Sequence, residues 1–116
     1  MGSVNKVILV GNLGKDPEIK SLDSGSKLAS FSLATSETFK DRSGQKQTST
    51  EWHNIVLWGK IADIAESYLK KGSKIYLEGK IKTRSWEQDG VKKYATDIVG
   101  TSLTMLGSND SGQSSQ

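Results

Sequence analysis

Three cations and one aromatic ring alternate along the polar run K-I-K-T-R-S-W, as Lys80, Lys82, Arg84 and Trp86. Alternate residues of a β-strand lie on the same face, so a strand here would align these four side chains. Cations attract phosphates, and an aromatic ring offers a flat face on which any base can stack. The pattern favours a surface for single-stranded nucleic acid. The alternative is a solvated row that only prevents sheet edges from pairing.

The other two tryptophans, Trp52 and Trp58, bracket the run W-H-N-I-V-L-W. The same alternation places both rings on a face with Asn54, while Ile55 and Leu57 point to the other side. A half-buried position is the common fate of a strand tryptophan, and the residues alone leave that alternative open. A polar neighbour on the same face favours exposure and stacking.

These side chains need elements to position them, and the hydrophobic spacing predicts five strands and one helix. The strands are expected at residues 4–10, 28–35, 50–58, 74–86 and 93–106, with a polar loop at 40–49. The helix is expected at residues 60–71, with its apolar face formed by Ile61, Ile64, Ala65 and Tyr68. At the same spacing, Tyr68 is expected to pack rather than to contact a ligand.

One helix between the third and fourth of five strands is the layout of an OB-fold barrel, so the expected class is all-β. A β-sandwich fragment and an SH3-like barrel are the alternatives. Residues 1–106 are expected to form this single domain. Residues 107–116 contain no apolar side chain, which predicts a disordered polar tail.

The composition argues against several kinds of site. The 116 residues contain no cysteine and one histidine, so no disulfide is expected and a zinc site is disfavoured. No paired carboxylates and no nucleophile–base pair stand out, and we expect no catalytic residue, no metal and no cofactor. No apolar run reaches the ~18 residues of a membrane span, and no signal peptide is visible. A cytoplasmic protein without a membrane partner is expected.

The first predicted strand is apolar on both faces, whereas a small barrel has only one interior. Its outer face is therefore expected to meet another subunit. The expected interface consists of Val4, Lys6, Ile8 and Val10, together with His53. Because His53 shares a face with Ile55 and Leu57, a place in the core is the alternative for it.

Several long stretches carry a family resemblance: N-K-V-I-L-V-G-N-L-G-K-D-P-E, F-S-L-A-T-S-E, T-E-W-H-N-I-V-L-W-G-K, Y-L-K-K-G-S-K-I-Y-L-E-G-K-I-K-T-R-S-W and G-T-S-L-T-M-L-G. Over about residues 4–107 the chain resembles the bacterial-type single-stranded DNA-binding proteins. The resemblance implies an OB-fold and a homotetramer. It also implies sequence-independent binding of single-stranded DNA in replication, repair and recombination, in the bacterial cytoplasm at the nucleoid.

The resemblance also implies roles for individual residues. The base-stacking rings fall on Phe39, Trp52, Trp58 and Trp86, with Tyr68 as a further aromatic position. The phosphate-binding cations fall on Lys6, Lys60, Lys71, Lys82 and Arg84, and the alternating row adds Lys80. The family often has Trp at position 39, Phe at 58 and Arg at 54. The ring exchanges keep a stacking face, whereas Asn54 removes one expected phosphate contact.

The family usually continues through a Gly- and Gln-rich linker to an acidic tip, which recruits replication and repair proteins. This chain stops at Gln116 without such a tip, so the resemblance predicts a core fragment that does not recruit those partners. A processed mitochondrial relative stays open as the source. An RNA-binding or structural OB subunit and a nuclease stay open as other functions.

Overall fold

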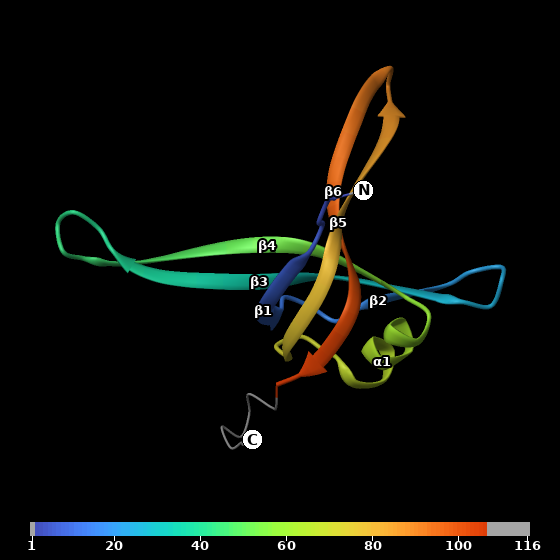
Figure 1. Ribbon diagram of the computed structural model, residues 1–116, viewed down its shortest axis with the longest axis horizontal. Coiled ribbons are helices and arrows are strands. Elements are labelled where there is room, and N and C mark those ends of the chain that lie inside the picture. The colour runs from blue at the N-terminus through green and yellow to red at the C-terminus, as the bar shows by residue number, and fades with distance from the viewer. Residues whose placement is uncertain (1, 107–116) are drawn as a thin grey trace.

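The structure is a computed structural model that describes residues 2–106 (Figure 1). Its elements are β1 (Val7–Leu13), β2 (Glu18–Ser21), β3 (Lys27–Lys40), β4 (Lys46–Trp58), α1 (Lys60–Tyr68), β5 (Lys74–Gln88) and β6 (Val91–Met105). The tail that was expected to be disordered, residues 107–116, lies outside the described residues.

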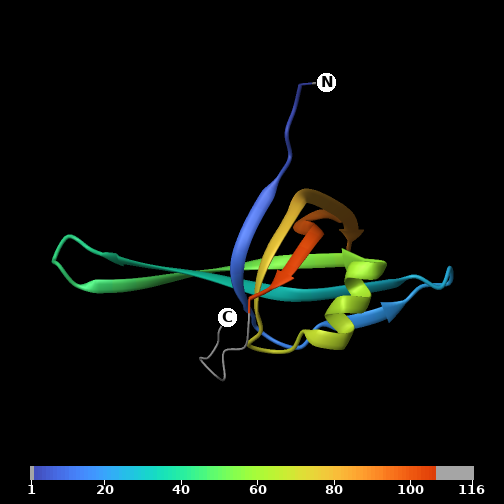
Figure 2. The ribbon, with the colours of Figure 1, turned by 60° about the horizontal axis from the view of Figure 1, so that its bottom comes forward.

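The strands form one sheet that closes on itself. Their order is β1-β5-β6-β4-β3-β2, and β1 also pairs with β3, so five long strands complete a barrel. The β4–β6 pairing is parallel and the others are antiparallel. The helix α1 follows β4 and packs against β3, β4 and β6 (Figure 2). This arrangement confirms the predicted five-stranded OB-fold with one helix.

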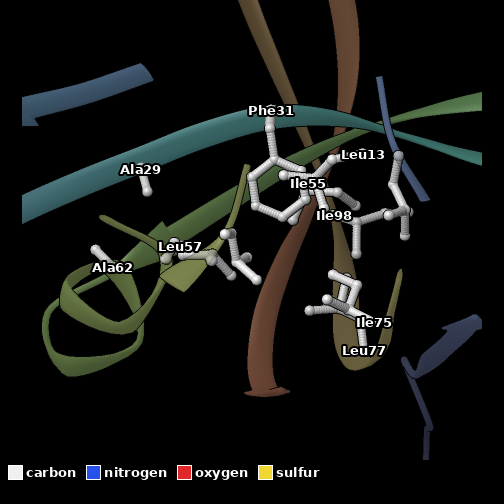
Figure 3. Packing of buried hydrophobic residues seen from close by; sticks show 12 residues of the cluster. Leu13, Ala29, Phe31, Ile55, Leu57, Ala62, Ile75, Leu77 and Ile98 are labelled. Atoms are coloured by element: carbon white, nitrogen blue, oxygen red, sulfur yellow. The ribbon is translucent and has the colours of Figure 1, made fainter. Parts of the chain in front are cut away.

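The barrel interior is filled by aliphatic side chains from every long strand (Figure 3). Its fully buried large residues are Leu33, Ile55, Leu57, Ile75 and Leu77. On β4, Ile55 and Leu57 alternate with exposed neighbours, as the sequence spacing predicts. The inward rows therefore fix which side chains of β4 must face outward.

Two long hairpins, β3–β4 and β5–β6, extend beyond the barrel (Figure 1). Both strands of β3–β4 remain paired as far as Lys40 and Lys46, although most side chains in this part are exposed. The loop predicted at residues 40–49 is therefore shorter than expected, because only residues 41–45 lie outside the two strands. Polar residues on both faces left no alternation of hydrophobicity to reveal the paired ends of β3 and β4. The four-residue β2, with one apolar side chain, escaped prediction for a similar reason.

The first strand begins and ends three residues later than expected, and its later end reflects its continuation through Gly11. A Cβ at Gly11 would lie 2.2 Å from the carbonyl oxygen of Ala34. Glycine therefore permits the close approach of β1 and β3 that closes the barrel. Before β1, the side-chain amide of Asn5 exchanges two 2.9 Å hydrogen bonds with the backbone of Ile81.

The predicted inward face of the helix is wrong at two positions. Ile64 is 39% exposed and Tyr68 is 64% exposed, whereas the buried helical residues are Ala62 and Ala65. Small alanine side chains let the helix approach the barrel closely, which leaves the bulkier residues at its margin. The expectation that Tyr68 packs in the interior is therefore wrong, and the helix ends at Tyr68 rather than at residue 71.

Candidate nucleic-acid interface

Strand register brings the three tryptophans onto one outer face. Paired residues on neighbouring strands project to the same side of a sheet. Val56 of β4 pairs with Val99 of β6, which pairs with Lys80 of β5, so the alternating rows of the three strands join. We call the result the tryptophan face; it comprises Trp52, Asn54, Val56, Trp58, Lys93, Ala95, Asp97, Val99, Lys80, Lys82, Arg84 and Trp86.

The rings on this face are open to solvent. Trp52 is 60% exposed, Trp58 50% and Trp86 40%, while the intervening Ile55 and Leu57 are fully buried. The predicted alternation along β4 is confirmed. Because large apolar side chains in a monomer are seldom left exposed together without a partner, three exposed tryptophans on one face indicate a binding surface.

The middle of the tryptophan face is hollowed. One hollow, beside Trp58, is bounded by cations of β5 and by Val56, Asp97 and Val99. A second hollow continues from it past Asn54 to Lys15 and Glu18, and the two share Val56, Arg84 and Asp97. We call the two together the central groove. It crosses from β5 to β3, and a groove that runs across several strands suits a linear polymer better than a small enclosed ligand.

Arg84 stands at the junction of the two hollows and contacts two neighbours. Its Nε donates a 2.6 Å hydrogen bond to Oδ2 of Asp97, with which it also forms an ion pair. Its guanidinium carbon lies 5.2 Å from the centre of the Trp86 ring, within the range of a cation–π interaction. The arginine and the tryptophan that the sequence placed in one row are therefore in contact.

Trp52 rests on the turn that follows β1. A Cβ added to Gly14 would lie 2.5 Å from the Cζ3 atom of the Trp52 ring. Only glycine leaves room for the ring in this position. The contact between Gly14 and Trp52 was not foreseen, since the two residues are far apart in the sequence.

Phe39 does not share the tryptophan face. Trp52 pairs with Ala34, and Phe39, five residues further along β3, projects from the opposite side of the β3–β4 hairpin. Its ring is 49% exposed. A nucleic acid that touched both rings would have to pass around the hairpin.

Three predicted contacts lie on or after the helix. Lys60 begins α1, two residues after Trp58, and Tyr68 ends it with an exposed ring. The side chain of Lys71 is exposed, and its backbone amide donates a 2.8 Å hydrogen bond to Asp16. These residues lie outside the rows of the tryptophan face. The helix follows that face in the chain, because Gly59 links Trp58 at the end of β4 to Lys60 at the start of α1.

The last predicted cation, Lys6, is engaged elsewhere. Its Nζ lies 3.2 Å from Glu78, a carboxylate that also accepts a 2.7 Å hydrogen bond from the hydroxyl of Tyr76. Together the hydrogen bond from Tyr76 and the charge of Lys6 lower the pKa of Glu78. Lys6 therefore belongs to a cluster where β1 and β5 pair, apart from the tryptophan face.

Part of the expected subunit interface comes together around another hollow. Ile8, Val10 and His53 line it, with Thr35, whose hydroxyl lies 2.9 Å from Nε2 of His53. Ile8 is 55% exposed and Val10 45%. Val4 and Lys6 do not line this hollow and precede β1.

Sequence reasoning missed Asp97 as a member of the site. It is 7% exposed, and it is the only charged residue that is buried among residues 2–106. The alternating run Y-A-T-D-I-V indicates which residues of β6 share a face with Asp97. The sequence does not predict, however, that Asp97 lies beside Lys82 of β5. Within residues 2–106, no group of three or more His, Cys, Asp or Glu side chains could hold a metal ion. None of the helices found there is long and apolar enough to cross a membrane.

Comparisons with known proteins agree with this geometry. The profile of the Single-strand binding protein family matches residues 4–106. Single-stranded DNA-binding protein 1 of Chlorobaculum tepidum is 57% identical over 111 residues, which are 94% of this chain and 68% of that protein. The solved structure of the Plasmodium falciparum SSB complex with ssDNA has a TM-score of 0.84 and 38% identity, covering 91% of this chain and 97% of that one. A deletion mutant of the single-stranded DNA-binding protein from Thermus aquaticus has a TM-score of 0.79 and 30% identity, covering 91% and 52%.

Proposed function

Because the chain belongs to the single-strand binding protein family, we propose that it binds single-stranded DNA along the tryptophan face, without regard to base sequence. The observation that carries the proposal is the joining of three exposed tryptophans and four cations on one face, the cations being Lys80, Lys82, Arg84 and Lys93. The structural relative that is described as a complex with ssDNA supports the same ligand.

Stacking is the sequence-independent part of the proposed mechanism. Every base has a π-face, and each base stacked on an aromatic ring contributes ~1–3 kcal/mol. Trp52 and Trp58 are six residues apart on β4, which separates them by roughly 20 Å at the usual rise of a strand. The two rings would therefore stack on bases that are not adjacent, and Trp86 would serve a further base on β5. We propose Phe39 and Tyr68 as additional rings outside this face.

Phosphate binding is the salt-dependent part. Lys80, Lys82 and Arg84 lie in one row along the central groove, and Lys60 and Lys71 extend the positive charge toward the helix. Each phosphate neutralised on a single strand changes log K by about −0.7 per unit of log salt concentration. Lys6, paired with Glu78, is assigned to the subunit contact rather than to this row.

We also propose that the protein is a homotetramer, and that the hollow lined by Ile8, Val10 and His53 is part of its subunit contact. Residues 1–106 would act as the DNA-binding domain, and residues 107–116 as the start of a polar linker. The wider role would be protection of single strands in replication, repair and recombination at the bacterial nucleoid. We propose binding without catalysis, and recruitment of replication and repair proteins is not assigned to these 116 residues.

A comparison of single-stranded and duplex DNA tests the proposed ligand. Duplex DNA hides its base faces, so stacking should be lost while attraction to phosphates remains. In a tryptophan-fluorescence titration at moderate salt, we expect strong quenching and tight binding with oligo-dT and weak binding with a duplex of equal length. Equal or tighter binding of the duplex would refute the proposal. An RNA oligonucleotide bound in preference to oligo-dT would favour an RNA-binding role instead.

A further inference from the structure

A buried carboxylate lies in the middle of a face that is otherwise suited to phosphates. Asp97 sits across from Lys82 on the neighbouring strand, and it lines both hollows of the central groove. A negative charge here weakens the attraction of the face for a polyanion. Its presence therefore calls for a reason other than general electrostatics.

The geometry around Asp97 supplies that reason. Its Oδ2 accepts a 2.6 Å hydrogen bond from Nε of Arg84, and the guanidinium carbon lies 5.2 Å from the centre of the Trp86 ring. The carboxylate thus holds one edge of the guanidinium, whose carbon lies over the Trp86 ring. The side chain of Asp97 is only 10% exposed, whereas that of Arg84 is 56% exposed, so the fixed partner is buried and the held one faces solvent.

The hydrogen bond to Asp97 uses one of the five N–H donors of the guanidinium. Among the described residues, no other hydrogen bond from Arg84 is found, which leaves the two terminal amino groups for a ligand. A long side chain normally loses its rotamer freedom when it binds, and this loss opposes binding. An arginine that is already held by a carboxylate and a ring has lost much of that freedom beforehand.

We propose that Asp97 is a positioning residue, which orders Arg84 against Trp86 so that the pair meets single-stranded DNA as one preformed unit. This inference rests on the proposed function, since it concerns the same ligand. The terminal amino groups of Arg84 would bind a phosphate or a base edge, and the ring of Trp86 would stack on a neighbouring base. Asp97 itself would not touch the DNA.

The substitution Asp97→Asn separates positioning from electrostatics, because the two predict opposite signs. Removal of a negative charge from the face should tighten binding if charge alone matters. If Asp97 positions Arg84, oligo-dT affinity should fall by roughly two- to tenfold, as expected for one long side chain that must be ordered on binding. Fluorescence titration at fixed salt measures the change, and thermal unfolding establishes that the variant is folded.

A matched control is Glu87→Gln, because Glu87 is exposed on the same β5–β6 hairpin but, paired with Lys92, projects from the face opposite Trp86, and no ion pair of Glu87 is found among the described residues. We expect this variant to bind oligo-dT as tightly as the unchanged protein, or slightly more tightly. The second control is a double-mutant cycle with Arg84→Gln. Once Arg84 is gone, Asp97→Asn should produce no further loss, whereas a general structural role would cost the same in both backgrounds.

The outcomes separate this inference from the proposed function. If the unchanged protein does not bind oligo-dT, the proposed function fails. If it binds, and Asp97→Asn binds equally well or more tightly, only the positioning role is overturned. An equal loss from Asp97→Asn with and without Arg84 would likewise overturn it. Should Asp97→Asn unfold, Asp97→Glu takes its place in the cycle, because it keeps the charge but changes the reach to Nε.

Discussion

At the scale of single residues, the binding surface depends on small supporting contacts. Trp52 occupies space that only Gly14 leaves free, and Arg84 is held between Asp97 and Trp86. Supporting residues of this kind restrict side chains that would otherwise sample many rotamers. Restriction before binding reduces the conformational entropy that is lost on binding. Both the order of the tryptophan face and its chemistry therefore contribute to affinity.

Asp41 supports the tip of the β3–β4 hairpin in a similar way. Its Oδ1 accepts hydrogen bonds from the hydroxyl and amide of Ser43 and from the amide of Gln45, and its Oδ2 accepts one from Gln47. These bonds, led by the Ser43 hydroxyl, lower the pKa of Asp41 from an ordinary 3.8 to about 2. Asp41 is partly buried and the residues that follow it in the tip are exposed, so the effect is local.

The lowered pKa of Asp41 predicts a direction for its effect with pH. A carboxylate whose folded pKa is depressed stabilises the fold above its unfolded pKa, and this contribution is lost as pH falls toward the folded value. We expect the order of the hairpin tip to be complete above about pH 4, and to decrease toward pH 2. Carboxyl NMR titration should give a midpoint near 2 for Asp41; a midpoint at the ordinary 3.8 would contradict the hydrogen-bonded tip.

At the scale of elements, the two sides of β1 have different surroundings. Its inward residues close the barrel, and its outward residues Ile8 and Val10 are left half exposed beside β5 and the hollow near His53. A strand that is apolar on both sides gains little from solvent on its outer face. This arrangement supports the proposed subunit contact, because among the described residues of a single chain nothing fully covers Ile8 and Val10.

Sedimentation tests that contact. A protein of 12.6 kDa per chain should sediment as a stable multimer, and Ile8→Asp should shift it toward the monomer by placing a charge in an apolar contact. Val91→Asp is the matched control, since Val91 is 56% exposed against 55% for Ile8 but lies at the β5–β6 turn. A monomer at all concentrations, or equal dissociation by both variants, would contradict the assignment.

For the whole molecule, the sequence could predict what depends on local periodicity. The order of five predicted strands and one helix was sufficient to predict the fold class, and the alternation in β4 separated Trp52 and Trp58 from the buried row. The sequence could not reveal pairing between distant strands, so the neighbours of Asp97 and the opposite orientation of Phe39 emerged only from the register. The helix face was wrong because close packing favoured alanines over bulkier residues at Ile64 and Tyr68.

The central claim is that the three tryptophans act together as one binding face, and alanine substitution tests it most directly. Trp52→Ala, Trp58→Ala and Trp86→Ala should each weaken binding of oligo-dT by ~1–3 kcal/mol, the usual contribution of a stacked base. Tyr94→Ala is the control, because Tyr94 is 65% exposed on the same hairpin as Trp86 but, paired with Ser85, projects from the other face. Its affinity should match that of the unchanged protein. Unchanged affinity in all three tryptophan variants, or a loss as large in Tyr94→Ala, would contradict the account.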